Sequence, residues 1–142
     1  MNCRQIERIA LGSIALFMLP AGLQATLAPK SFIDDFPLGR GWVAGRGDVY
    51  NEHLVRDVGG LFLALIIVTG WTAWRRGHVR PVAVAWLVQG VPHAIFHAGH
   101  LDGHDTLDKI GLLGSLVAVP VLALIALWAG WAGSGERTLA TR

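Results

Sequence analysis

The sequence predicts an all-α protein, a four-helix transmembrane bundle with an extracytoplasmic cap loop between helices one and two. Hydrophobic residues make up 53% of its 142 residues and charged residues only 15%, which is typical of a small unit surrounded by lipid. The apolar residues gather in four runs of about 17–23 residues, each long enough as a helix to cross most or all of a layer roughly 30 Å thick. We therefore expect residues 1–142 to form a single membrane domain.

The four apolar runs define the expected spans, which cover residues 9–28, 58–74, 82–101 and 110–132. Prolines fall inside three of them, at Pro20, Pro92 and Pro120. We expect kinks there, because neighbouring membrane helices can satisfy the carbonyl groups that proline leaves unbonded. The first run also resembles a signal peptide, since Arg4 and Arg8 precede it and Ala25 offers a small residue for cleavage. A retained helix and a cleaved signal peptide are both open at this point.

The connection at residues 29–57 is too apolar for a free linker and too rich in glycine for a long helix. Its aromatic residues include Phe32, Phe36 and Trp42. We expect this cap loop to fold back over the helix ends, above the histidines of the third span.

The distribution of lysine and arginine places both termini in the cytoplasm. Seven of the twelve lie on the side of the termini and five on the other side. Three of the seven share one short connection, namely Arg75, Arg76 and Arg80. Tryptophans near the cytoplasmic ends of the second and fourth spans support this orientation, because indoles prefer the boundary between lipid and water. They are Trp71, Trp74, Trp128 and Trp131.

Composition excludes several classes of function. The formal net charge is only +2 and no lysine-rich block occurs, so no nucleic-acid partner is expected. Because Cys3 is the only cysteine, an intrachain disulfide and a multi-cysteine metal site are excluded, and any metal must be held by His, Asp or Glu. No G-x-S-x-G, P-loop or dinucleotide-binding motif occurs.

Four histidines follow one another at steps of four, three and four residues, at His93, His97, His100 and His104. At about 100° per residue, these steps place the rings on one side of a single helix, although His104 follows Gly103 and is expected to lie past the helix end. Compensation of the helix dipole accounts for histidines near a C-terminus. It does not account for His93, which lies roughly two turns further inside, where an ionisable group is costly and normally serves a site.

A second polar segment precedes the second span, and a short turn joins that span to the third. We therefore expect the start of one to meet the end of the other at the outer surface. Within this segment, Glu52 can pair with Arg56 and His53 with Asp57, since each pair is four residues apart.

Together, the two segments predict a transition-metal site for Zn, Cu or Fe, with haem b as a lesser alternative. The expected ligands are His93, His97, His100, His53 and Glu52. Residues expected to orient these ligands or complete the site are Asp57, Arg56, Asp102 and His104. A proton-responsive hydrogen-bonded network and simple interfacial packing are the alternative interpretations of the histidines.

The predicted function is metal handling or redox chemistry on the extracytoplasmic side, and whether the protein is an enzyme is open. A non-catalytic membrane subunit that docks on a larger complex is one alternative. A small proton-coupled transport module is another, and it would require a homo-oligomer to enclose a path.

The segment from Asn51 to Gly59, N-E-H-x-x-R-D-x-G, followed by the P-H-x-x-x-H motif from Pro92 to His97, resembles small four-helix integral membrane proteins of actinobacterial type. That poorly characterised family implies four spans in a bacterial plasma (inner) membrane and names no reaction. His93, His97 and His100 also resemble one histidine box of membrane fatty-acid hydroxylases, which have more histidines and carry them at the cytoplasmic face. A pair such as His53 and His97 is similar to the haem ligands of b-type cytochromes.

Overall fold

The structure is a computed structural model that describes residues 2–43, 49–75 and 77–140, the side chains of residues 133–140 excepted. Its described residues form helices and no strand. The helices are α1 (Cys3–Leu27), α2 (Pro29–Asp35), α3 (Glu52–Arg75), α4 (Val79–Ala98) and α5 (Thr106–Ala140). All except α2 are long and apolar enough to cross a membrane, with Thr106–Ala132 as the candidate span of α5. The all-helical class is confirmed, as is the presence of four helices long and apolar enough to span a membrane.

Capping groups set helix ends that hydropathy does not reveal. Residue Asn2 caps α1 in a capping box, in which its side chain accepts from the N–H of Gln5 and the Gln5 side chain accepts from the N–H of Asn2. Asn51 caps α3 by accepting from the N–H of Leu54 at 3.1 Å. The helices α1 and α3 therefore begin about six residues before the apolar runs.

Two other boundaries, in the cap loop and at the end of the third span, differ from expectation. The expected cap loop contains a helix, α2, which begins at Pro29, a residue well suited to the first helical position. The third span was expected to continue to residue 101, but α4 ends at Ala98 and Gly99 follows as its C-cap. Residues 44–48 of the cap loop and Arg76 lie outside the described residues. The prolines are retained inside α1, α4 and α5, and the kinks expected there stay predictions.

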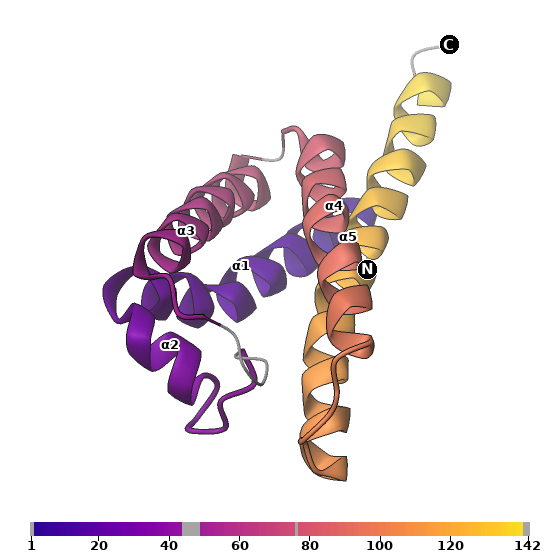
Figure 1. Cartoon of the computed structure of the whole chain (residues 1–142). Coiled ribbons are helices and arrows are strands. Elements are labelled where there is room, and N and C mark those ends of the chain that lie inside the picture. The colour runs from indigo at the N-terminus through magenta and orange to yellow at the C-terminus, as the bar shows by residue number, and fades with distance from the viewer. Residues whose placement is uncertain (1, 44–48, 76, 141–142) are drawn as a thin grey trace.

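The four long helices do not form a regular bundle of sequential neighbours (Figure 1). Helix α1 packs mainly against α3 and α5, while α4 packs mainly along α5. Helices α3 and α4 diverge from the short connection that joins them, and their mutual packing is sparse. We call the end where α1 and α4 finish, and where α3 and α5 begin, the cap end. The opposite end, where α3 finishes and α4 begins, is the termini end.

The core is built where α1, α3, α4 and α5 come together. Leu11, Ile14 and Trp86 are 0% exposed, and the indole N–H of Trp86 on α4 donates to the hydroxyl of Thr69 on α3 at 2.8 Å. Because α1 supplies two of these residues, its removal would take away a substantial part of the core. In this structure α1 is therefore an integral part of the core.

Glycines allow the closest helix contacts. A Cβ added at Gly59 of α3 would lie 2.6 Å from the Thr26 hydroxyl and 2.7 Å from the Thr26 backbone nitrogen on α1. At Gly90 of α4, an added Cβ would lie 3.0 Å from the ring of Pro120 on α5. Small residues at such crossings let membrane helices approach closely, and they fix which helices pair here.

The described part of the cap loop folds back onto the helices, as expected, and contacts α1 and the start of α5. Phe32 of α2 is buried against α1, and the indole N–H of Trp42 donates to Asp108 of α5 at 3.0 Å. Arg40 forms an ion pair with the same carboxylate. The ring of Trp42 also lies where a Cβ at Gly111 would point, so the loop is fastened to the first turns of α5.

Candidate functional site

The last turns of α4 carry His93 and His97 on one helix face. Their ring centroids are 4.7 Å apart and the ring planes are 83° to each other, so the edge of one ring meets the face of the other. His93 is exposed and His97 is partly buried. Of the four histidines predicted to lie on one side of a single helix, these two do so.

His100 lies just beyond the C-cap rather than on the helix. Its ring stacks on Phe96, with centroids 4.2 Å apart and planes 19° from parallel. The Nδ1 atom lies 2.7 Å from the carbonyl oxygen of Phe96, an arrangement that requires the proton on Nδ1 and leaves the Nε2 lone pair free. The prediction that His100 shares the helix with His93 and His97 was wrong, because α4 ends at Ala98.

His104 lies past the helix end, as expected, and Gly103 beside it has a φ of +88°. The N–H of His100 donates to the carbonyl oxygen of His97 at 3.0 Å, and the N–H of His104 donates to that of Leu101 at 3.3 Å, so the connection turns back close to the end of α4. The Nδ1 atom of His104 is buried, and among the buried side-chain nitrogen and oxygen atoms of the described residues it is the one without a hydrogen-bond partner. The four histidines are therefore neighbours at the cap end even though only two share the helix.

The polar residues at the start of α3 pair along their own helix, as the spacing predicts. Arg56 binds Glu52, with an Nη2 to Oε1 distance of 2.8 Å, and it also donates to the carbonyl oxygen of Thr26 near the end of α1. His53 lies 3.3 Å from Asp57, and its side chain is 88% exposed. Arg56 thus fastens α3 to α1, while His53 and Asp57 face the surroundings.

The two polar segments are not brought together within one chain. Among the described residues, no group of three or more His, Cys, Asp or Glu side chains is arranged to hold a metal ion. The expected meeting of the α3 start with the α4 end was wrong, because α3 follows α1 while α4 follows α5 (Figure 1). His53 and Glu52 are consequently not assembled with the α4 histidines. Asp102 is exposed in the connection between α4 and α5.

Asp108 has a structural role that the sequence did not reveal. Asp108 binds both Trp42 and Arg40 from the cap. Asp105 accepts from the N–H of Asp108 at 2.7 Å and so caps the start of α5. The sequence signal that could have indicated this contact is Trp42, a large aromatic residue in a glycine-rich loop whose indole N–H needs an acceptor.

Comparison with known proteins identifies one family. Residues 6–98, more than half of the chain, match the family described as a domain of unknown function, DUF4345. The match begins within α1 and ends at the last residue of α4, so it includes the histidine pair. No curated protein and no solved structure matches the chain.

Proposed function

The chain belongs to the DUF4345 family, a family without an assigned activity, and from this premise we propose that it is an integral membrane protein whose α4 histidines bind a transition metal. The observation that carries the proposal is the His93–His97 pair, two imidazoles on one helix face with centroids 4.7 Å apart. Histidines four residues apart on a helix are a recurrent way to present two nitrogen ligands to one ion.

The chemistry requires a modest rearrangement and an additional ligand. In the edge-to-face arrangement the two lone pairs do not converge, and a rotation of the exposed His93 ring would turn it toward an ion shared with His97. His100 is suited to be a third ligand, since its Nδ1 bond to the Phe96 carbonyl orients the ring and leaves Nε2 free. Neutral imidazole suits Zn, Cu or Fe.

The site is incomplete in one chain, which favours a role in an assembly. Structural zinc takes four protein ligands and catalytic zinc usually three, whereas the acids of α3 are occupied along their own helix. We infer that the remaining ligand comes from a second copy or from another subunit of a membrane complex. The proposal therefore combines two of the expected functions, metal handling and membership of a larger membrane complex. It assigns no reaction.

The proposal includes location and orientation. The protein resides in a bacterial inner membrane with both termini in the cytoplasm, which puts the histidines on the extracytoplasmic side. The support is the bias of lysine and arginine toward the termini end, including Arg75 and Arg80 at the connection of α3 and α4.

Isothermal titration of the purified full chain in nanodiscs with Zn²⁺ tests the metal proposal. We expect His93→Ala and His97→Ala each to weaken Zn²⁺ binding by about ten-fold or more, because each removes a ligand. His53→Ala is the matched control, an exposed histidine at the same end, and should leave binding unchanged. Absence of Zn²⁺ binding by the unmodified chain, or an equal effect of all three substitutions, would overturn the α4 site.

A further inference from the structure

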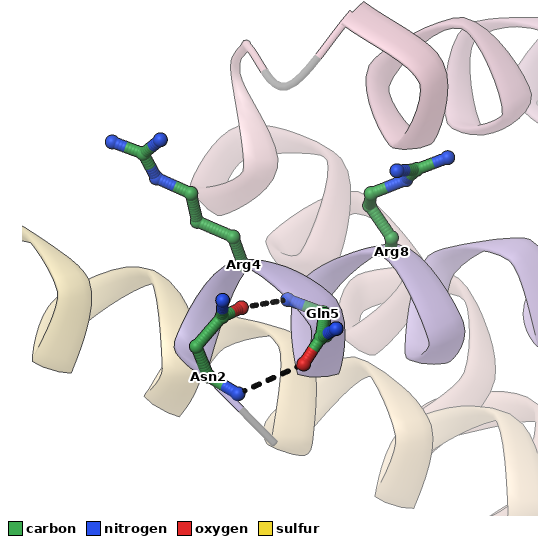
Figure 2. Close-up of a pocket in the computed structure, with 4 residues that line it drawn as sticks. All are labelled: Asn2, Arg4, Gln5 and Arg8. Carbon is green, nitrogen blue, oxygen red and sulfur yellow. Dashed lines mark hydrogen bonds between the residues drawn. The ribbon is translucent and has the colours of Figure 1, made fainter.

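A pocket lies at the first turns of α1, at the termini end and far along the chain from the histidines (Figure 2). It has a volume of about 220 Å³ and is lined by Asn2, Arg4, Gln5 and Arg8. Arg4 and Arg8 are exposed and extend outward from successive turns of the helix. The pocket is thus lined by two side-chain amides and two arginines, whose guanidinium groups extend away from each other in Figure 2.

The polar groups that remain available in this pocket are hydrogen-bond donors. The side-chain oxygens of Asn2 and Gln5 are used by the capping box, at 2.9 and 3.1 Å. Their NH₂ groups are left, together with the donors of two arginines, which have no acceptor of their own. A ligand for this lining has to supply several acceptor oxygens and negative charge.

No acid among the residues whose side chains the structure describes is paired with either arginine. The only acid of α1 is Glu7, which is 8% exposed and lies on the packed side of the helix, with an oxygen 3.7 Å from the position of a Cβ at Gly130 of α5. The positive end of the α1 dipole adds to the same field.

The surface below the pocket is apolar and open. At four-residue steps from Arg4 and Arg8 along α1 follow Gly12, where an added Cβ would meet nothing within 4 Å, and Leu16, which is 74% exposed. One face of a membrane-crossing helix therefore presents cations and donors at its end and an unobstructed apolar stripe beneath them. A cationic end followed by an apolar surface fits a phospholipid, whose phosphate would lie at the interface and whose acyl chain would lie along the helix.

We propose that Arg4 and Arg8, with the amides of Asn2 and Gln5, bind the phosphodiester of an anionic glycerophospholipid whose acyl chain lies over Gly12 and Leu16. The site is independent of the metal proposal, since it involves neither α4 nor any histidine. Arginine is well suited to it, because its planar group can bind two phosphate oxygens at once.

Native mass spectrometry of the full chain, titrated with phosphatidylglycerol or phosphatidylcholine, tests the proposal. Removing both charges in Arg4→Gln/Arg8→Gln is expected to weaken phosphatidylglycerol binding by on the order of ten-fold or more, since each substitution removes charge-assisted hydrogen bonds to the phosphate. Arg75→Gln is the matched control at the same end. Its guanidinium lies over the rings of Trp71 and Trp74, at 5.0 and 4.8 Å, and its substitution should change binding by about two-fold or less.

Three outcomes would overturn the site. The first is an equal loss in Arg75→Gln, which would indicate general attraction to a negative surface. The second is equal binding of phosphatidylcholine, and the third is displacement of the lipid by millimolar inorganic phosphate, which would make free phosphate the ligand. If the double variant folds poorly, Arg4→Gln and Arg8→Gln singly carry the same test, each with an expected loss of a few-fold.

Discussion

At the level of single residues, the hydrogen bond from Trp86 to Thr69 is the polar link inside the apolar core. The Thr69 hydroxyl accepts from the Trp86 indole at 2.8 Å and donates to the carbonyl oxygen of Leu65 at 2.7 Å. Thr69→Val keeps the shape of the side chain but leaves the indole N–H without an acceptor. We expect a loss of roughly 1 kcal/mol in the free energy of unfolding, measured in mixed micelles. Thr69→Ser keeps the hydroxyl and should lose less, and an equal loss in both variants would show that the bond contributes nothing.

Asp108 is the residue that fastens the cap to α5. Asp108→Ala removes the acceptor of both Trp42 and Arg40, so the cap segment should open more often. Hydrogen exchange of a peptide covering residues 36–43 should become faster. Asp102→Ala is the control, an exposed acid in the preceding connection, and should leave this exchange unchanged. Unaltered exchange in Asp108→Ala would mean that the packing of Trp42 on Gly111 holds the cap without its polar contacts.

At the level of helices, the crossing of α1 and α3 depends on the absence of a side chain at Gly59. In Gly59→Ala, the new Cβ would press on the backbone of Ala25 and Thr26, which cannot move aside as a flexible side chain can. A loss of about 1–3 kcal/mol in unfolding free energy is expected, read from denaturation in micelles. Gly60→Ala, one position along the same helix, meets nothing within 4 Å and should be neutral or slightly stabilising. Similar losses at both positions would argue against the close crossing.

The sequence predicts the long helices well because a long uninterrupted apolar run indicates a membrane helix whatever its neighbours are. Only helices and closed barrels satisfy backbone groups in lipid, so four long apolar runs indicate four helices. Their ends were less predictable, since capping by Asn2 and Asn51 adds polar turns outside the apolar runs. Helix α2 was missed because the composition of the whole cap loop obscured a short helix beginning at Pro29.

At the level of the whole molecule, helix pairing could not be read from connectivity. Lipid chains are as apolar as leucine, so burial does not select partners, and small residues decide which backbones approach. Gly59 pairs α3 with α1, and Gly90 pairs α4 with α5, although a short connection joins α3 to α4. The prediction that His53 and Glu52 lie beside the α4 histidines was wrong for the same reason, because it assumed that helices adjacent in sequence are adjacent in space. Its local pairs, Glu52 with Arg56 and His53 with Asp57, depended only on helix periodicity and are confirmed.

The proposed orientation predicts which ends are accessible from outside the cell. In spheroplasts, a membrane-impermeant maleimide should leave Cys3 unlabelled until the membrane is permeabilised, because the termini end faces the cytoplasm. The variant Asp102→Cys in a Cys3→Ser background should be labelled without permeabilisation, since residue 102 is exposed at the cap end. The reverse pattern of labelling would invert the topology and put the histidines on the cytoplasmic side.

If a second copy completes the histidine site, metal binding and self-association must be linked. With His93, His97 and His100 of one chain on the ion, one histidine of a second copy supplies the fourth nitrogen ligand that a tetrahedral Zn²⁺ prefers. Because Zn²⁺ then binds the dimer more tightly than the single chain, it must favour the dimer by the same free energy.

Native mass measurements should therefore show more dimer when Zn²⁺ is added and a return toward single chains when a chelator removes it. His97→Ala should abolish the response, while His53→Ala should retain it. Zn²⁺ that binds with full stoichiometry but leaves the mass distribution unchanged would exclude a second copy as the source of the missing ligands. The remaining positions on the ion would then be filled by the same chain or by solvent, and the proposal of an assembly that completes the site would fall with them.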